Sequence, residues 1–352
     1  MVLGYHCTFV QGFPYALALA FNSIFNGNLG VRFFFIISGF LITWLMLLER
    51  DATGSVSLRE FYIRRSLRIL PVYVFFLGVL AFLDLTGINK QTSAAWIGNL
   101  TFTRNSLGTF TNGDSLSAHL WSLSVEEQFY LAWPVLFFLL GRKSNDRTIL
   151  GILVMTILAM CVIRGLNDSA FNLGGISFQF LQPVLLWNSL KNFDSLAFGC
   201  ASAVLFAHRR EMIEPLLKRY ALWAAGLGIA LVAFPFISNW LPLKPVAIVQ
   251  LQPALQALGF SILLLHSIVS PDWGFHRMLN HQWIRQVGIW SYSLYIWQQL
   301  FWKPPHILGL DHIWWMGAWI IPLFALAIVS YYGLERPFFK LRSRHREVKF
   351  SE

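Results

Sequence analysis

Residues 119–134 read HLWSLSVEEQFYLAWP, and they place two adjacent acids, Glu126 and Glu127, at the start of a hydrophobic run. Residues 120–140 are otherwise almost wholly apolar, and at about 1.5 Å per residue they can cross a bilayer core of about 30 Å. An acidic side chain at mid-depth costs on the order of 3 kcal/mol unless it faces a protein or water-lined interior. The stretch therefore predicts a membrane helix with a functional interior face.

The composition extends this prediction to the whole chain. Of its 352 residues, 56% are hydrophobic and only 12% are charged. This excludes an ordinary soluble domain and predicts an all-α, polytopic bundle of transmembrane helices in a lipid bilayer. We expect about ten segments, the first of them short or truncated: Met1–Leu19, Leu29–Leu48, Ile69–Leu85, Leu120–Leu140, Thr148–Ile163, Leu190–Ala207, Tyr220–Ile237, Val246–Val269, Val287–Trp302 and Trp314–Leu334.

The basic residues predict the orientation. Alternate loops, assigned to opposite sides, carry 20 of the 27 Lys and Arg residues on one side and six on the other, and Arg32 lies within a span. The positive-inside rule then places both termini in the cytoplasm. A net charge of +10 spread over these loops argues against nucleic acid as a partner. We expect one membrane domain over residues 1–340 and a basic cytoplasmic tail over residues 341–352.

Three arginines lie near the ends of apolar runs. Arg65 and Arg68 share a helix face at i, i+3, where guanidinium groups suit the phosphates of a ligand. An ordinary positive-inside anchor explains these two equally well. Arg32 either binds substrate or extends to the outer interface. Ser38, with Gly39 at the centre of the same span, either lines a site or allows close packing of helices.

Two aromatic residues are further candidates for substrate binding. Trp121 either stacks on a sugar or packs in the interfacial aromatic belt. Tyr292 and the hydroxyl residues beside it either line a cavity or form hydrogen bonds between helices. The polar segment of residues 86–117 could cover an acceptor site. No two histidines stand at i, i+4, so we predict no metal.

Seven short motifs follow one another along nearly the whole chain. They are VLGYH at 2–6, GVRFFFIISGF at 30–40, RRSLRILP at 64–71, WSLSVEEQFYL at 121–131, FDSLAFG at 193–199, SYSLYIWQQ at 291–299 and ERP at 335–337. Each motif is weak alone, but the ordered set resembles the acyltransferase 3 family of integral-membrane O-acyltransferases, which modify bacterial cell-surface glycans.

The resemblance implies a multi-pass protein of the bacterial cytoplasmic (inner) membrane with no bound cofactor. Its donor would be acyl-CoA, expected to be acetyl-CoA, on the cytoplasmic side. Its acceptor would be a hydroxyl of a polysaccharide, a lipopolysaccharide or a lipid-linked saccharide, presented from the other side. The resemblance also makes His6 the catalytic histidine. In the family an arginine precedes that histidine by eleven positions, so we expect the first span to start upstream of Met1, through a late start codon or a truncation.

Transfer of an acyl group from a thioester to an alcohol needs a base, a group that stabilises the oxyanion, and exclusion of water. His6 fits the role of base, although a histidine at that position without the family pattern could be structural. Glu126 could orient His6 and stabilise its charge, or it could be a structural acid paired with Arg32. We prefer Glu126 to Glu127 because Glu126 shares a helix face with Tyr130, a candidate for substrate binding, whereas Glu127 points about 100° away.

Two other functions remain open at this point. A transporter or flippase of a lipid-linked glycan would also bury charges and span the membrane repeatedly. An inactive, truncated family member would act only through its interactions. Export of glycan without turnover of acyl-CoA would favour the transporter.

Overall fold

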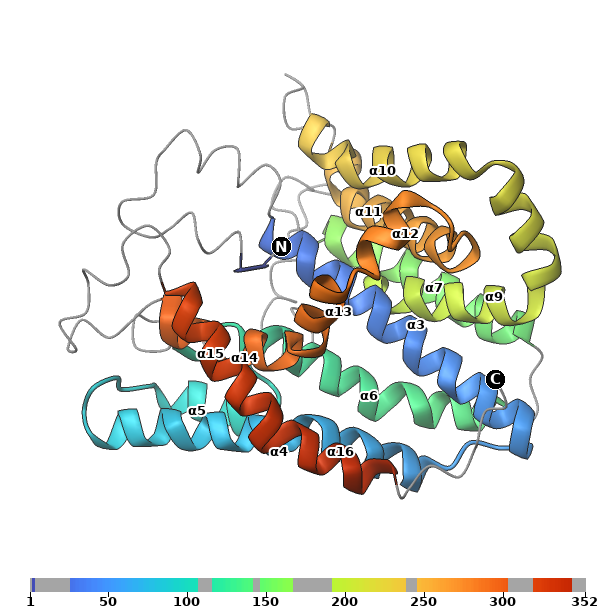
Figure 1. The fold of residues 1–352 in the computed structure, drawn as a ribbon. Helices are drawn as coiled ribbons and strands as arrows, with labels where there is room; N and C mark the ends of the chain where they lie inside the picture. The colour runs from blue at the N-terminus through green and yellow to red at the C-terminus, as the bar shows by residue number, and fades with distance from the viewer. Residues whose placement is uncertain are drawn as a thin grey trace. The chain divides into compact units, whose positions relative to one another are not determined.

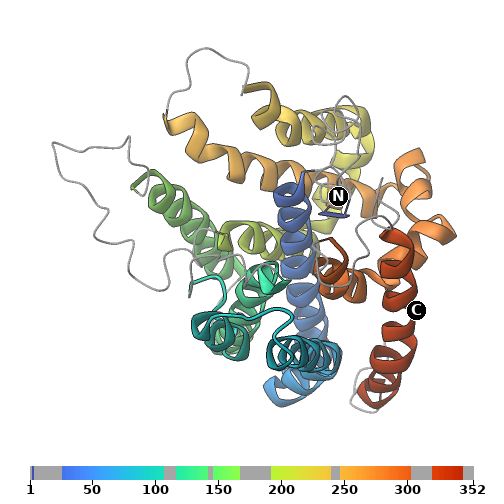
Figure 2. The ribbon, with the colours of Figure 1, turned by 90° about the vertical axis from the view of Figure 1, so that its left-hand side faces the viewer.

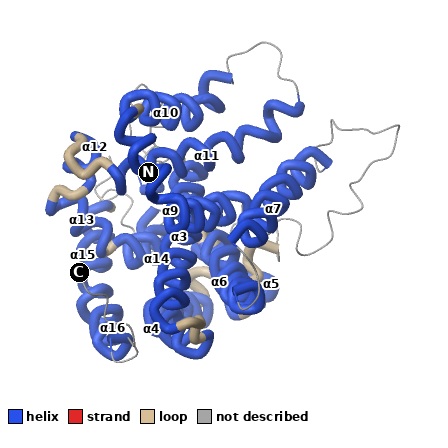
Figure 3. Tube along the Cα trace, turned by 90° about the vertical axis from the view of Figure 1, so that its right-hand side faces the viewer, coloured by secondary structure: helices blue, strands red, loops and turns tan. Residues whose placement is uncertain are grey.

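The computed structural model describes residues 2–3, 26–106, 116–141, 146–166, 192–238, 246–302 and 319–343. Every regular element in these ranges is a helix (Figure 3), so the predicted all-α fold is confirmed. The chain forms two compact units, each assembled from distant segments. Unit 1 takes in residues 1–30, 57–124 and 282–352, and unit 2 takes in residues 31–56 and 125–281.

The helices are labelled in Figure 1. Unit 2 holds most of α3 (Gly27–Thr53) and α6 (Leu120–Gly141), with α7 (Asp146–Leu166), α9 (Phe193–Arg219), α10 (Ala221–Ser238), α11 (Val246–Val269) and α12 (Gly274–Leu279). Unit 1 holds α4 (Leu58–Leu85), α5 (Ser93–Leu100), α13 (Gln282–Ile289), α14 (Ser291–Trp302), α15 (Ile320–Ser330), the π-helix η5 (Tyr331–Glu335) and α16 (Arg336–Ser343).

Six of the described helices are long and apolar enough to cross a membrane: α3, α4, α6, α7, α10 and α11. Each of them overlaps one of the ten predicted segments. The α4 helix begins eleven residues before the predicted start at Ile69, because the arginine-rich stretch is already helical and the Ser57 hydroxyl accepts the backbone N–H of Glu60 as an N-cap. Most of the first predicted segment, Met1–Leu19, lies outside the described residues.

The predicted segment Leu190–Ala207 ends before the break of α9 at Arg209 (φ −127°, ψ 21°), and the 16 residues of α9 before that break span about 24 Å. Two other predicted segments are divided in the structure, which corrects the expectation of uninterrupted spans there. A turn at Trp290 separates α13, which has no buried residue, from the largely buried α14. The π-helix η5 interrupts the last segment, of which residues 314–318 lie outside the described ranges.

Within unit 2, α3 and α9 meet at two glycines. A Cβ atom on Gly39 would lie 2.2 Å from the carbonyl oxygen of Leu196, and one on Gly199 would lie 2.1 Å from the carbonyl oxygen of Ile36. Both distances are far below contact, so the two backbones approach as closely as they do only because side chains are absent. This close approach fixes the height of Ser38 on α3.

The α10 and α11 helices of unit 2 lie side by side, as Figure 2 shows. Glycine again allows the approach, because a Cβ atom on Gly259 would come within 2.7 Å of the Gly228 carbonyl oxygen. The α10 helix carries apolar side chains on almost every side. It therefore associates with α11 through close packing of the two backbones and not through polar side chains.

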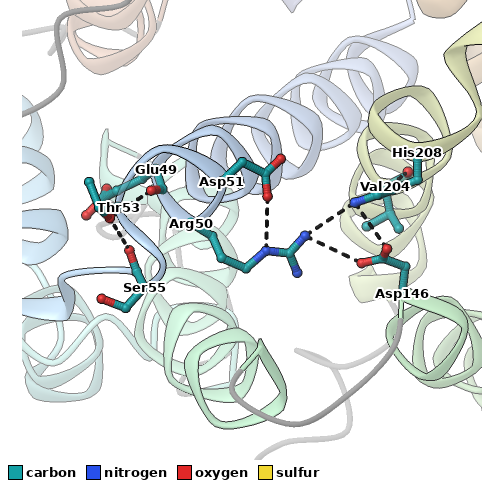
Figure 4. A network of polar contacts seen from close by, with 8 residues as sticks. All are labelled: Glu49, Arg50, Asp51, Thr53, Ser55, Asp146, Val204 and His208. Atoms are coloured by element: carbon teal, nitrogen blue, oxygen red, sulfur yellow. Dashed lines mark hydrogen bonds and ion pairs between the residues drawn. The ribbon is translucent and has the colours of Figure 1, made fainter.

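A polar network joins the ends of α3, α7 and α9 in unit 2 (Figure 4). The Arg50 Nη2 atom lies 3.5 Å from Asp146 Oδ1 and 3.3 Å from His208 Nε2, and His208 Nε2 lies 3.1 Å from Asp146 Oδ2. The His208 Nδ1 atom lies 3.1 Å from the carbonyl oxygen of Val204. The network marks the polar boundary of these three helices, one residue before α9 breaks.

Beyond the break, α9 is an exposed helix. Glu214 accepts hydrogen bonds from Lys218 Nζ at 2.7 Å and from Arg210 Nε at 3.0 Å. These bonds, chiefly the one from Lys218, lower the pKa of the Glu214 carboxyl. The pairs therefore persist as the pH falls until it passes the lowered pKa of Glu214.

In unit 1, α4 is the longest helix, with 28 residues and a length of about 42 Å. The segment predicted to be a polar outer loop is partly structured, since it contains α5. The α5 helix is held by the Tyr73 hydroxyl, which donates to the Asn99 carbonyl at 2.7 Å, and by Trp96 Nε1, which donates to Asp84 Oδ2 at 2.6 Å. The α16 helix packs against α4.

Candidate functional site

Of the two predicted catalytic residues, His6 and Glu126, the structure describes Glu126. It lies in the unit 2 part of α6 and is 1% exposed. The Ser38 hydroxyl of α3 donates to Glu126 Oε1 at 2.5 Å. The packing of Gly39 on α9 positions Ser38 for this bond, because the two residues are adjacent on α3. Gly39 therefore packs against α9, and Ser38 holds the Glu126 carboxylate, while substrate binding by Ser38 stays a prediction.

The neighbours of Glu126 on α6 lie as the helical spacing predicts. Ser122, Glu126 and Tyr130 are all buried, whereas Glu127 is partly exposed. Ser122, Glu126 and Tyr130 share one face of α6 because residues four apart on a helix lie on the same side. Trp121, the first residue of the motif, is also partly exposed.

Arg32 does not pair with Glu126 in the described part of unit 2. Its Nη1 atom donates to Gln256 Oε1 at 3.1 Å, and it lies within electrostatic reach of Asp194 and Arg164. The Asp194 carboxylate, 1% exposed, forms an ion pair with Arg164 Nη1 at 2.6 Å. Charged side chains from α3, α7 and α9 therefore lie near one another within unit 2, with Asp194 fully buried and Arg32 and Arg164 partly exposed.

Sequence reasoning missed the role of Arg164. The predicted segment Thr148–Ile163 ends one residue before Arg164, whereas the structure places Arg164 in the last turn of α7, with its Nε atom donating to the Gln250 carbonyl at 3.2 Å. The signal was present, because an acid inside a membrane segment needs a cation, but the sequence does not show which one.

The predicted phosphate-binding arginines lie on α4 of unit 1. Arg65 is partly exposed and Arg68 is exposed. Arg68 lies within electrostatic reach of Glu335, which is buried at the end of η5 and accepts a 2.5 Å hydrogen bond from the Ser293 hydroxyl. Glu335 was not chosen as a candidate from the sequence, although it is an acid that ends an apolar run.

Tyr292 and Tyr295 on α14 form helix-to-helix hydrogen bonds within unit 1. The Tyr292 hydroxyl donates to the Ile69 carbonyl of α4 at 2.8 Å, and the Tyr295 hydroxyl donates to the His119 carbonyl at 2.9 Å. The His119 ring returns a bond, since its Nε2 atom lies 3.0 Å from the carbonyl oxygen of Ile296. Of the two roles expected for these hydroxyls, hydrogen bonding between helices is therefore observed.

His6, the predicted catalytic histidine, lies outside the described residues. The pairing of His6 with Glu126 therefore stays a prediction. Among the side chains that the structure describes, no group of three or more His, Cys, Asp or Glu residues could hold a metal ion. Unit 2 offers the buried carboxylate of Glu126 with the hydroxyl of Ser38, which suit proton transfer, and unit 1 offers the guanidinium groups of Arg65 and Arg68, which suit the binding of anions.

Comparison with known proteins adds the family. The chain matches the model of an acyltransferase domain over residues 1–333. It is 25% identical to the peptidoglycan O-acetyltransferase OatA of Listeria monocytogenes over 92% of this chain and 53% of that protein. It is 26% identical to a provisionally named O-acetyltransferase of Staphylococcus aureus, over 77% of this chain and 45% of that protein. It is 25% identical to a provisionally named peptidoglycan O-acetyltransferase of Bacillus subtilis, over 91% of this chain and 51% of that protein.

The chain spans about half the length of these curated relatives. No solved structure matches it significantly. The family match nevertheless covers almost the whole chain, including the motifs that carry Ser38, Arg65, Arg68 and Glu126. With six apolar helices of membrane-spanning length among its described residues, the chain is a multi-pass membrane protein and belongs to the acyltransferase 3 family.

Proposed function

We propose that this protein transfers an acetyl group from acetyl-CoA to a hydroxyl of a cell-surface or lipid-linked glycan. The observation that carries the proposal is the Glu126 carboxylate, buried in an apolar helix of an acyltransferase family and held by Ser38. Buried acids in membrane helices are rare and functional by default. The names of two relatives favour peptidoglycan as the glycan.

In the proposed reaction, His6 takes the proton of the acceptor hydroxyl as the hydroxyl oxygen attacks the thioester carbonyl. The new C–O bond forms, the C–S bond breaks, and the proton passes from His6 to the sulfur of the departing CoA. Glu126 orients the imidazole and stabilises its positive charge during the transfer. Ser38 keeps the Glu126 carboxylate in one rotamer, which is a positioning role.

Contacts within unit 2 support the part of the predicted topology that says which loops and helix ends share a side of the membrane. Arg50, Asp146 and His208, which the predicted topology places on the cytoplasmic side, contact one another. Arg164 and Asp194, predicted to lie on the opposite side, form an ion pair. If α3, α7 or α9 crossed the membrane in the direction opposite to the prediction, a residue of the first set would lie beside residues of the second.

The donor would be held at the cytoplasmic side by Arg65 and Arg68. Guanidinium groups at i, i+3 present parallel N–H donors to phosphate oxygens. In the unliganded protein Arg68 lies near Glu335. The CoA phosphates would therefore compete with that carboxylate for Arg68.

A transfer assay in sealed vesicles tests the proposal. Purified protein is given acetyl-CoA with a labelled acetyl group on one side and peptidoglycan fragments on the other, and labelled glycan is measured by mass spectrometry. We expect His6→Ala to lower transfer by about 100-fold or more. His281→Ala is the matched control, because His281 is exposed. Undiminished transfer by His6→Ala would refute the role of His6, and glycan export without acetyl-CoA turnover would refute the proposed reaction.

A further inference from the structure

Two adjacent glutamines on α14 of unit 1 are buried, and three of their four polar side-chain atoms have no hydrogen-bond partner in the part of the chain that the structure describes. Gln298 is 1% exposed and Gln299 is 4% exposed. Neither Oε1 nor Nε2 of Gln298, nor Oε1 of Gln299, has a hydrogen-bond partner within the described ranges. Gln256 of unit 2 is buried too, but its Oε1 accepts from Arg32 and its Nε2 donates to the Val232 carbonyl at 3.4 Å.

Helix geometry places the two carboxamides on a polar face of α14. Gln298 and Gln299 follow Tyr295 by three and four residues, so they lie one turn beyond Tyr295 on its side of the helix. Tyr295 bonds to Ser122 and to the carbonyl of His119 at the start of α6. On this face of α14, Tyr295 is hydrogen-bonded to residues at the start of α6. One helical turn further along, three polar atoms of Gln298 and Gln299 have no partner among the described residues.

An unpaired carboxamide in a protein interior is unfavourable, because it has lost its bonds to water and gained none. Such groups in native proteins call for an explanation, and a bound ligand or an ordered water is the usual one. Three unpaired atoms on consecutive residues provide two acceptors and one donor with two hydrogens. We propose that Gln298 and Gln299 bind an uncharged, hydrogen-bonding part of one of the two substrates of the proposed acyl transfer, on which this inference rests.

The chemistry of the face selects the ligand. Residues 294–301 read LYIWQQLF and carry no charge, so the face does not suit phosphate. A phosphate would also bring no donor for the two Oε1 atoms. Hydroxyls of a sugar ring and secondary amides bring both donors and acceptors. These groups occur in the glycan acceptor and in the pantetheine arm of acyl-CoA, so both sources share the required chemistry.

The test is the variant Gln298→Leu, which keeps the approximate volume and removes the polar atoms. If the carboxamide is kept for a ligand, its loss should raise the unfolding temperature of the unliganded protein, because an unpaired amide no longer has to be buried. Gln256→Leu is the matched control, and its unfolding temperature should fall because Arg32 and the Val232 carbonyl lose a partner.

Binding is measured by calorimetry with two probes, CoA and the peptidoglycan disaccharide of N-acetylglucosamine and N-acetylmuramic acid. We expect Gln298→Leu to weaken the binding of one probe about tenfold, as the loss of two hydrogen bonds would. Weaker binding of the disaccharide assigns the face to the sugar ring, and weaker binding of CoA assigns it to the pantetheine arm.

Unchanged affinity for both probes would overturn the proposal, and so would a Gln298→Leu protein that does not fold, because the carboxamide would then be structural. Calorimetry needs no turnover, which separates the two proposals. A chain that binds a probe through Gln298 but transfers no acetyl group would refute the proposed function and leave this site intact.

Discussion

The contact of α3 with α9 predicts a large effect from the smallest possible substitution. Gly199→Ala adds one methyl group, whose carbon would lie 2.1 Å from the Ile36 carbonyl oxygen and 2.8 Å from the Phe40 backbone nitrogen. Both obstacles are backbone atoms, so no side chain can rotate away. To reach 3.0 Å, the shortest distance that Cβ atoms keep, the two helices must separate by about 0.9 Å.

The energy follows from this displacement. Overpacking a well-packed interior costs typically 1–3 kcal/mol, and a clash with rigid backbone belongs at the upper end, at about 3 kcal/mol or more. The better helix propensity of alanine returns only about 0.5–1 kcal/mol. The unfolding entropy of a 352-residue chain is about 0.7 kcal/mol/K, so this net loss of about 2–2.5 kcal/mol should lower the unfolding temperature by roughly 3 °C.

The measurement is the thermal unfolding of purified protein in detergent, followed by the fluorescence of its tryptophans. Gly226→Ala is the control, because a Cβ atom on this exposed glycine of α10 meets nothing within 4 Å, and its unfolding temperature should stay the same or rise. Gly39→Ala should behave as Gly199→Ala does. If Gly199→Ala unfolds within about 1 °C of the parent protein, the close approach of α3 and α9 is wrong.

The same unfolding assay tests three polar contacts. Asp194→Asn should cost about 3–5 kcal/mol, because it leaves the guanidinium of Arg164 buried without its counter-charge. Asp146→Asn should cost about 1 kcal/mol or less, because the ion pair with Arg50 is partly exposed; equal losses in the two variants would contradict the difference in burial. Thr43→Val should cost about 1–3 kcal/mol, because the Trp133 Nε1 donor, now 2.9 Å from the Thr43 hydroxyl, would stay buried without an acceptor, and an unchanged unfolding temperature would count against that bond.

The hydrophobic pattern predicts the spans where apolarity and helix continuity coincide, as in α3, α6, α7, α10 and α11. The hydrophobic pattern fails where a continuous apolar stretch contains an interruption of the helix. Hydropathy does not register that a turn at Trp290 divides α13 from α14, or that η5 interrupts the last helical run. These are backbone events inside apolar sequence, so they depend on packing that the pattern does not encode.

The candidate site shows a similar division. The spacing on one helix separates Glu126 from Glu127, and the structure buries Glu126 and leaves Glu127 partly exposed, while the catalytic role of Glu126 stays a prediction. The partners of the buried charges depend on which helices pack together. The sequence therefore offered His6 or Arg32 for Glu126 and no cation for Asp194, whereas the described residues give Ser38 for Glu126 and Arg164 for Asp194.

Single-turnover transfer from labelled acetyl-CoA in sealed vesicles, with Glu126→Gln beside Glu127→Gln, tests the central claim most directly. The amide removes the charge of Glu126 but keeps its shape and its contact with Ser38. We predict that Glu126→Gln lowers the rate by about 100-fold or more while CoA binding and the unfolding temperature are retained, and that Glu127→Gln stays within about threefold of the parent protein. Transfer by Glu126→Gln at the parent rate would contradict a role for this buried carboxylate in acyl transfer.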